Sequence, residues 1–463
     1  MHAFPFRFPA AALLIAASGW LVFPARVARA ADTTHASAAV ERRLSELEER
    51  ADRWDAASEE LTHIADELES LKNEIDAAGG NSDQAAQLEE RIRALEEKLK
   101  THDDRLKGLR RDLDRALAEL PDIHLTGEVD LAYAYDFDRP ADGHVALRAL
   151  EHDDDNDFSF EHAKLAAAGS ILDTVDARVE VLFGRSAQFL APLTRGNLGS
   201  DDVDVEQVYL SYRVPVGNGL TLTLGKVASR LGAEVIEPPA NDPFSRSFIF
   251  TLGIPHTYTG LIGSYSFFDG ATDVELGVVN GWDSVDDGND GKTVVGRVAD
   301  HVSDGLDVAL AGTWGAEQPG REGPKRGTGD LIVTVRPVDE LSFLLEFLYG
   351  HEADAVMPPP DAPSGAPLRD AGWRAFSGIA RYDATDKVSL SLRGEVFDDV
   401  DGARSGQAQQ LWEVTETFAY QVIANLVARV EHRHDESDHA AFGHGQGLSR
   451  SQDTASCDVS YRF

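Results

Sequence analysis

The connections between the extended segments of residues 122–463 constrain the fold of this chain more than any single motif does. From Ile123 onward, apolar and polar side chains alternate with a period of two, as they do in β-strands. Connections after the even-numbered segments are tight, as at Asp269-Gly270, whereas those after the odd-numbered segments are long, as at 230–254. A Greek-key sandwich gives no reason for this alternation, but an up-and-down membrane barrel has short turns on one rim and long loops on the other.

The pattern therefore predicts an all-β fold, a sixteen-stranded antiparallel up-and-down transmembrane β-barrel over residues 122–463. The sheet must close, because an open edge in lipid leaves unpaired N–H and C=O groups. Sixteen strands enclose a water-filled lumen, whereas eight are filled by side chains. The expected strands lie near 123–137, 157–172, 174–185, 203–214, 219–229, 255–268, 271–283, 291–302, 305–316, 327–337, 340–351, 371–383, 386–398, 408–420, 422–434 and 451–463.

The last segment, Ser451–Phe463, places Cys457, Val459, Tyr461 and Phe463 on one face and only polar residues on the other. Such a strand, ending on an aromatic residue, resembles the closing strand that the outer-membrane assembly machinery recognises. We expect Tyr461 and Phe463 to form this assembly signal. The plainer alternative is an ordinary edge strand at a C-terminus.

Charge and composition exclude several classes of protein. The chain has 80 acidic and 43 basic residues, a formal net charge of −37, which argues against a nucleic-acid partner. A single cysteine, Cys457, excludes an intramolecular disulfide. No apolar run of about twenty residues follows the N-terminal region, so a helical membrane bundle is not expected.

Residues 1–30 have the pattern of a secretory signal peptide. Arg7 precedes an apolar run over 9–23, and Ala28-Arg29-Ala30 fits the small-x-small cleavage rule. We expect cleavage after Ala30, export into a periplasm, and a final location in the outer membrane.

Residues 31–121 predict a periplasmic α-helical coiled coil. Apolar residues follow heptad spacing in two helices, about 38–78 and 84–120, and Gly79-Gly80 breaks the pattern between them. Two geometries fit: a parallel stalk joining several chains, or an antiparallel hairpin within one chain. We expect the stalk, and with it a homo-oligomer such as a trimer, because so regular a seam in a membrane-anchored protein usually serves oligomerisation. The segment would hold chains together or space the barrel from the cell wall.

The polar faces of the strands predict the lining of the lumen. Both charge signs occur, which indicates a hydrated wall rather than a selectivity ring of one sign. Glu275 and Arg297 belong to this set. The principal expected lining residues are Glu128, Asp130, Arg178, Glu180, Arg213, Arg336, Glu346, Arg393, Glu395, Arg429 and Asp458.

Two stretches resemble a known family. They are GAEVIEPPA at 232–240 and FSRSFIFTLGIPHTYTG at 244–260, and shorter echoes follow at 277–283, 393–402 and 430–435. They resemble the signature region of the OmpL-like β-barrel porins, over most of residues 123–463. The resemblance implies an outer-membrane porin. The long acidic coiled coil departs from the simplest members of that family.

The connection 230–254 carries more apolar residues than a loop in water needs, among them Phe244, Phe248, Ile249 and Phe250. We expect it to fold into the lumen and narrow the pore, with Arg246 facing acidic residues across a transverse field. External packing, on a neighbouring subunit or as a plug on the rim, is the alternative. The expected constriction residues are Glu234, Glu237, Asp242 and Arg246.

No arrangement of residues predicts covalent chemistry, a nucleotide or another cofactor. A group of histidines with nearby carboxylates in the last loop could bind a transition metal, but solvation is the expected state and no metal is predicted. The group comprises His432, His434, His439, His444, Asp435, Glu436 and Asp438.

The sequence thus predicts a non-enzymatic outer-membrane porin for passive diffusion of small hydrophilic solutes or ions, in contact with membrane lipids. Two alternatives remain open. One is a structural tether between outer membrane and cell wall through the coiled coil. The other is a channel specific for an anion or a metal complex.

Overall fold

The computed structural model describes residues 123–148, 156–172, 174–193, 203–358 and 362–463, together with scattered helical positions between 67 and 111. The chain divides into two compact units, Met1–Pro121 and Asp122–Phe463. The expected signal peptide and most of the expected coiled coil lie outside the described residues. Among the residues described, no helix combines the length and the apolar character needed to cross a membrane.

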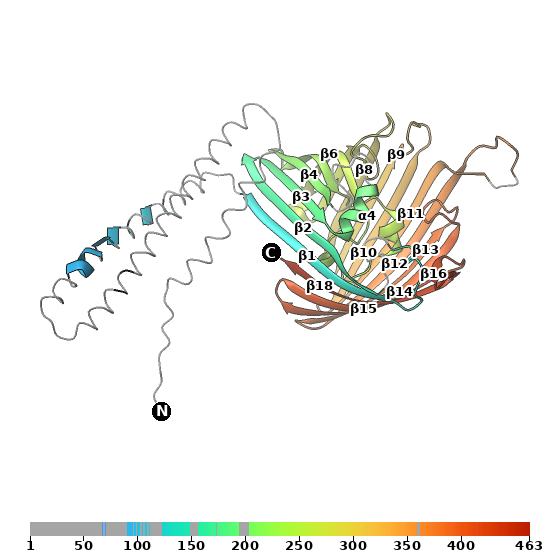
Figure 1. Ribbon diagram of the computed structural model, residues 1–463. Coiled ribbons are helices and arrows are strands. Elements are labelled where there is room, and N and C mark those ends of the chain that lie inside the picture. Colours follow the sequence, from blue (N-terminus) through green and yellow to red (C-terminus); the bar gives the residue numbers. More distant parts are fainter. Residues whose placement is uncertain are drawn as a thin grey trace. The chain divides into compact units, whose positions relative to one another are not determined.

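Sixteen strands of the second unit form a closed antiparallel barrel (Figure 1). The count and order expected from the sequence are confirmed, and strand ends differ by at most five residues. The strands are β1 (Ile123–Asp136), β2 (Asp157–Leu172), β3 (Val175–Phe183), β4 (Val203–Val214), β5 (Leu220–Ala228), β6 (Thr257–Phe267), β7 (Thr272–Val279), β8 (Thr293–Ser303), β9 (Leu306–Gly315), β10 (Arg326–Val338), β11 (Leu341–Val356), β12 (Arg369–Thr385), β13 (Val388–Asp399), β14 (Gln409–Ile423), β15 (Leu426–Ser437) and β18 (Ser451–Arg462).

Short elements occupy the connections between the barrel strands. Helix α4 (Arg185–Leu193) follows β3, and the hairpin of β16 (Phe442–His444) and β17 (Gly447–Ser449) precedes β18. The connection between β5 and β6 contains a 3₁₀ turn, η3 (Pro238–Ala240), and a π-helical turn, η4 (Ile249–Gly253). A further 3₁₀ turn, η5 (Phe268–Gly270), links β6 to β7.

Polarity in the barrel wall is inverted relative to a water-soluble protein. On β15, Val430 is 59% exposed, whereas its neighbours Arg429 and Glu431 are 3% and 2% exposed. Because successive side chains of a strand point to opposite faces, the apolar set faces outward and the polar set faces the lumen. This is the arrangement expected of a wall between lipid and an aqueous interior.

A β-bulge explains why the alternation of β2 changes phase in the sequence. Asp130 pairs with His162 and Leu131 pairs with Phe160, so that Glu161 is an extra residue. Phe158 therefore faces outward while Lys164, of the same sequence parity, faces the lumen.

The neighbouring polar residues Glu416 and His432 face outward near the middle of their strands. Glu416 on β14 is exposed and lies opposite Leu392 on one side and His432 on the other. The alternation of the sequence also puts Glu416 on the apolar side of this strand, and the pairing with β13 and β15 has no register shift at this position.

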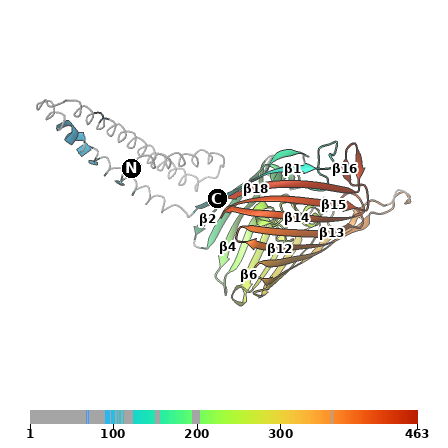
Figure 2. The ribbon, with the colours of Figure 1, turned by 90° about the horizontal axis from the view of Figure 1, so that it is seen from below.

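The barrel closes at the last strand, β18, which pairs with β15 on one side and β1 on the other (Figure 2). Phe463 continues this ladder: its N–H donates to the Gly127 carbonyl at 2.9 Å, and the Gly127 N–H donates to the Phe463 carbonyl at 3.1 Å. A Cβ atom on Gly127 would lie 2.4 Å from the Phe463 ring, so the close approach requires glycine. Tyr461 and Phe463 point outward and are 39% and 55% exposed.

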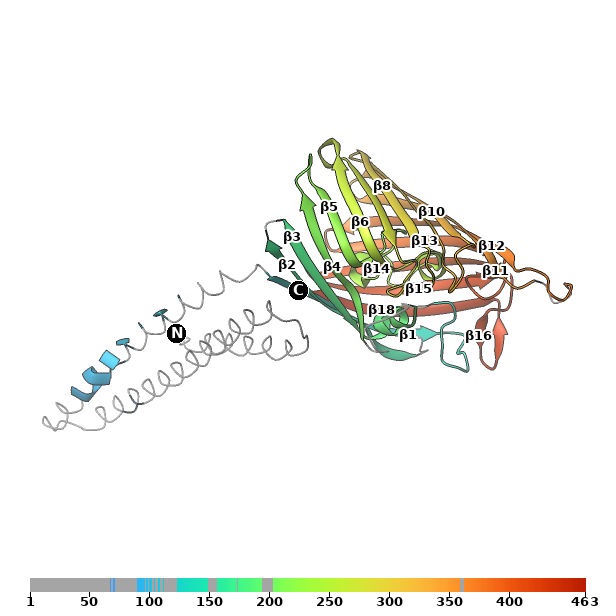
Figure 3. The same ribbon diagram turned by 90° about the horizontal axis from the view of Figure 1, so that it is seen from above.

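The connection between β5 and β6 lies inside the ring of strands (Figure 3), and the main apolar cluster is built around it rather than within the wall. The connection between β5 and β6 supplies Phe248, Ile249 and other residues, and α4 supplies Ala187 and Leu190. Inward-facing Trp373 and Phe397 from the wall complete it. The lumen is therefore partly filled by its own miniature core.

Candidate functional site

The connection 230–254, called the inner loop below, crosses the lumen and binds the opposite wall. The Glu431 carboxylate on β15 accepts the N–H groups of Phe244 and Ser245 at 2.7 and 3.0 Å. The Glu395 carboxylate on β13 accepts those of Phe248 and Ile249 at 2.6 and 2.7 Å. The structure therefore shows the loop folded inward, as its excess of apolar residues indicated.

Three arginines of the same wall bind the carbonyl groups of the inner loop. Arg393 donates to the Ser245 carbonyl at 2.6 Å, and Arg429 donates to the carbonyls of Pro238 and Asn241 at 3.0 and 2.9 Å. Arg433 donates to the Arg246 carbonyl at 2.6 Å. Charge-assisted bonds of this kind are the stronger ones in proteins, so the loop is fixed at several points.

Other strands extend this attachment. The N–H groups of Gly232 and Ala233 donate to Asp330 on β10 and Glu346 on β11, at 2.9 and 3.1 Å. At the other end of the loop, the Trp373 indole on β12 donates to the Gly253 carbonyl at 3.2 Å. The inner loop is thus bonded to the wall from β10 to β15.

Arg404, in the connection after β13, closes over this end of the loop. Its guanidinium donates to the Leu252 carbonyl and lies 5.3 Å from the ring centres of both Trp282 and Trp373. Burial lowers the pKa of Arg404 to about 10, so the group remains protonated at neutral pH. The site therefore combines a hydrogen bond with cation–π contacts.

Three of the four expected constriction residues attach the inner loop to the wall, and the fourth bonds within the loop. Glu234 is 2.6 Å from the Arg393 guanidinium, Glu237 binds Lys164 on β2, and Asp242 binds Arg381 on β12. Arg246 differs from expectation. It is 2% exposed, and its guanidinium donates to the carbonyls of Val235, Phe244 and Ile236 at 2.7 to 3.0 Å, all within the inner loop.

The expected lining residues separate into two groups. Arg213 and Arg336 lie at strand ends on the rim of short turns and are exposed, and Arg178 is half-buried. The rest point inward but are buried, because the inner loop and neighbouring side chains cover them. These are Glu128, Asp130, Glu180, Glu346, Arg393, Glu395, Arg429 and Asp458.

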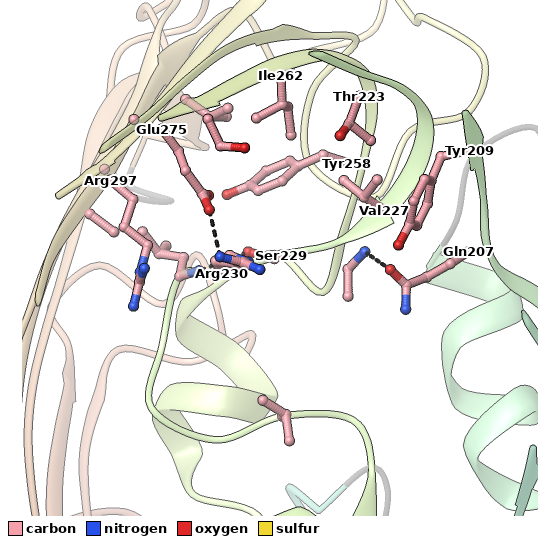
Figure 4. Close-up of a pocket in the computed structure, with 18 of the residues that line it drawn as sticks. Gln207, Tyr209, Thr223, Val227, Ser229, Arg230, Tyr258, Ile262, Glu275 and Arg297 are labelled. Carbon is pink, nitrogen blue, oxygen red and sulfur yellow. Dashed lines mark hydrogen bonds and ion pairs between the residues drawn. The ribbon is translucent and has the colours of Figure 1, made fainter. Parts of the chain in front are cut away.

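Open space remains on the other side of the lumen, between the inner loop and the wall from β4 to β9 (Figure 4). The cavity there has a volume of about 360 Å³. Its charged residues are Arg230, Glu275 and Arg297, and Arg230 and Glu275 form an ion pair at 2.5 Å. Hydroxyl groups of Tyr209, Ser211, Thr223, Ser229, Tyr258 and Ser264 also line the cavity. Apolar side chains line the rest of it, from Val227, Ala228, Leu231, Val235, Ile262, Val295 and Ala311.

The sequence predicts some of the residues that line this cavity but not all of them. Glu275 and Arg297 were expected in the lumen. Tyr209 and Ser211 share the inward parity of Arg213, so strand alternation contains the signal for them. Arg230 follows the end of β5, where no alternation applies.

The four histidines of the group noted in the last loop are dispersed in the structure. His432 and His434 belong to β15 rather than to the loop, and both lie near Asp453, at 3.6 and 2.8 Å. His439 pairs with Asp438 and His444 with Asp138. Among the described residues these side chains form no group able to share one metal ion.

A family model described as "Putative beta-barrel porin-2, OmpL-like" matches residues 122–463. The chain belongs to this family. The family is one of porins, so the barrel is a channel protein of the outer membrane and not an enzyme.

Solved structures agree with the fold. The outer membrane channel DcaP of Acinetobacter baumannii is 13% identical, with a TM-score of 0.51, over 74% of this chain and 97% of that one. Salmonella typhi OmpF is 12% identical, with a TM-score of 0.49, over 74% and 98%. The anion-selective porin from Comamonas acidovorans is 12% identical, with a TM-score of 0.46, over 74% and 100%. No curated protein matches the sequence.

Proposed function

We propose that this porin passes small hydrophilic solutes by passive diffusion, along a path confined between the inner loop and the β4–β9 wall. The cavity of about 360 Å³ in that position carries the proposal. The inner loop is bonded to the strands from β10 to β15, so the side of the lumen away from those strands is the one left for solutes. In this role the inner loop is the constriction of the pore.

The charges beside the path favour a modest preference for anions. The cavity is lined by two guanidinium groups, of Arg230 and Arg297, and by one carboxylate, of Glu275. The carboxylates of Glu234 and Asp242 on the inner loop are each paired with an arginine. Charged side chains at a narrow point act strongly on passing ions.

The reversal potential under a salt gradient tests this ion preference. Arg230→Gln removes a guanidinium that is 64% exposed in its side chain, and we expect the selectivity to move toward cations. An unchanged reversal potential would contradict the preference without affecting the diffusion path.

Single-channel conductance in planar bilayers tests the path itself. Ser264 on β6 lines the cavity, so Ser264→Trp should lower conductance. Leu261 on the same strand is 49% exposed on the outer face, so Leu261→Trp is the matched control and should leave conductance unchanged. A refolded wild-type barrel without current would remove the channel proposal and leave the tether as the remaining interpretation.

We also infer that residues 38–120 form the periplasmic coiled coil, and that it is an antiparallel hairpin rather than the parallel stalk expected from its heptad pattern. The support is an ion pair of 3.8 Å between Arg91 and Glu67. Gly79 lies midway between the two in the sequence, as a turn at Gly79-Gly80 requires. Light scattering of the detergent-solubilised protein, with and without residues 31–120, tests it: a hairpin predicts the same oligomeric state, and a stalk predicts loss of the oligomer.

Tyr461 and Phe463 are proposed as the signal read by the outer-membrane assembly machinery. Their rings point outward, are exposed and stack at 6.2 Å between centres, which leaves them accessible to a binding partner. Phe463→Ala should reduce the amount of heat-modifiable barrel in cells while allowing refolding of purified protein. Equal assembly of both forms in cells would oppose this role.

A further inference from the structure

Three carboxylates from separate parts of the chain converge at one side of the lumen. Glu180 lies on β3, Glu206 on β4 and Glu237 on the inner loop just before η3. One carboxylate oxygen of each lies within 4.8 Å of the other two. This set is called the carboxylate triad below. It is distinct from the solute cavity, which none of the three lines.

Glu206 is the member that the rest of the protein leaves unsatisfied. The ladder between β3 and β4 shifts register at this point, because Glu180 pairs with Gln207 and Val181 pairs with Val205. The extra residue, Glu206, turns inward and is 0% exposed. Neither of its carboxylate oxygens accepts a hydrogen bond from any residue that the structure describes. A buried carboxylate in this state is costly unless a cation or hydrogen-bond donor reaches it.

A single ammonium group, that of Lys164, lies close to all three carboxylates of the triad. The Lys164 Nζ atom is 3.3 Å from Glu180 and 3.8 Å from Glu206, and it also binds Glu237. It lies 3.9 Å from a fourth carboxylate, that of Glu128. Within the described part of the chain, Lys164 is the one basic group within 4.0 Å of Glu206. Four carboxylates therefore lie around this one ammonium group.

Neighbouring basic groups relieve only two of these carboxylates. Arg178 pairs with Glu180, and Arg462 and His162 lie beside Glu128. Glu206 and Glu237 depend on Lys164. The geometry thus has more negative charge and more free oxygen acceptors than one ammonium group can match.

We propose that Glu180, Glu206 and Glu237 form a Ca²⁺ site that ties the inner loop to the β3–β4 wall. The donors are all carboxylate oxygens, which suit a hard cation. Calcium holds oxygen ligands at about 2.3–2.6 Å, so two of them can lie up to about 5 Å apart, as the triad does. Magnesium requires about 2.0–2.1 Å and near-octahedral geometry, and it usually keeps several waters rather than binding in an all-protein site.

The site would add an attachment on the side of the inner loop that faces β2–β4. Most of the bonds already described run to the strands from β10 to β15. On the other side, Arg230 pairs with Glu275 on β7, and Glu237 pairs with Lys164 on β2. A bound cation would hold Glu237 against both Glu180 and Glu206. A cation at this site would hold the inner loop in place whichever solute passes through the pore.

Calcium titration of the full-length protein in detergent micelles tests the site. After treatment with chelator, isothermal titration calorimetry with CaCl₂ is performed in about 0.15 M KCl, which screens weak binding to exposed carboxylates. We expect one Ca²⁺ site in the wild type that is absent from Glu206→Gln and from Glu237→Gln. Glu322→Gln, in an exposed loop, is the matched control and should retain it.

Lys164→Gln provides a test in the opposite direction. Because the ammonium group competes for the same oxygens, its removal should raise the Ca²⁺ affinity at least about tenfold. Heat-modifiable gel mobility establishes that each variant is folded. The proposal is overturned if wild type and Glu206→Gln bind the same number of ions with equal affinity, or if folded Lys164→Gln binds Ca²⁺ no more tightly than the wild type.

Discussion

At the scale of single residues, buried carboxylates act as acceptors for backbone groups of the inner loop. Glu395 and Glu431 each take two consecutive N–H groups, which a loop without regular structure would otherwise leave unpaired in a crowded lumen. Their role is comparable to that of a capping residue at a helix N-terminus. Strand alternation alone would place these two carboxylates in the pore lining, but in the structure they accept hydrogen bonds from the inner loop.

Glu431→Ala removes the acceptor of the Phe244 and Ser245 N–H groups and of the Thr417 hydroxyl. Each buried donor left unpaired costs about 1–3 kcal/mol, so we expect a loss of at least that size in the free energy of unfolding. Urea titration in detergent, followed by tryptophan fluorescence, measures it. Glu431→Gln keeps one accepting oxygen and should lose less; equal stability of all three proteins would contradict the assigned role.

Glu317, in the connection after β9, gives a pH-dependent prediction. Burial raises the pKa of its carboxyl above the ordinary value, although Thr293 and the Trp282 N–H donate to it at 2.6 and 2.8 Å. A raised folded-state pKa means that the unfolded chain releases this proton first, so the group stabilises the fold at low pH and that stabilisation is lost as pH rises through the folded pKa.

Glu317→Gln should therefore gain stability relative to the wild type between about pH 4.5 and 7.5, because the amide stays neutral throughout. Midpoints of urea unfolding at the two pH values measure the change. Glu322→Gln in the same connection is exposed and serves as the control. A difference between Glu317→Gln and wild type that does not vary with pH would show that the carboxyl does not titrate with folding.

At the scale of elements, the inner loop is held by both polar bonds and an apolar contact surface. Phe248 is 0% exposed and lies under the Arg433 guanidinium, 4.9 Å from ring centre to Cζ. It packs with residues of α4 and of the wall in the apolar cluster. The two kinds of contact involve the same short stretch, so losing either should loosen the loop as a unit.

Phe248→Ala should destabilise the attachment by about 3–5 kcal/mol, as large-to-small changes in a packed core do. A loosened loop would give higher or more variable single-channel conductance. Phe347→Ala on the outer face of β11, where Phe347 is 46% exposed, is the control and should conduct as the wild type does. Unchanged current in Phe248→Ala would mean that the polar bonds alone fix the loop.

At the scale of the whole molecule, the lumen has two unequal sides. The strands from β10 to β15 are bonded to the inner loop, and the strands from β4 to β9 border open space. The apolar cluster is inside the ring, while the outward surface supplies apolar side chains to lipid. Among the residues that the structure describes, the contacts that shape the lumen lie within the barrel unit.

Deletion of residues 31–120 should therefore leave a barrel that folds and conducts. The chain divides between Pro121 and Asp122, and all the strands that pair to close the barrel lie after this boundary. Heat-modifiable gel mobility and single-channel conductance of the shortened protein measure this. A shortened chain that fails to close would show that the N-terminal unit takes part in forming the barrel.

The sequence by itself determined the barrel, its strand count, its inward and outward faces and the identity of the inner loop. These follow from local properties: a period of two, turn length, and apolar residues where a loop in water needs none. Only the tertiary structure decided which inward charges meet water. Arg393 and Ser245, or Glu431 and Phe244, are far apart in the chain and meet across the lumen, so no local pattern distinguishes them from true pore lining. Strand alternation tells which way a side chain points, and only the path of the loop decides what it contacts there.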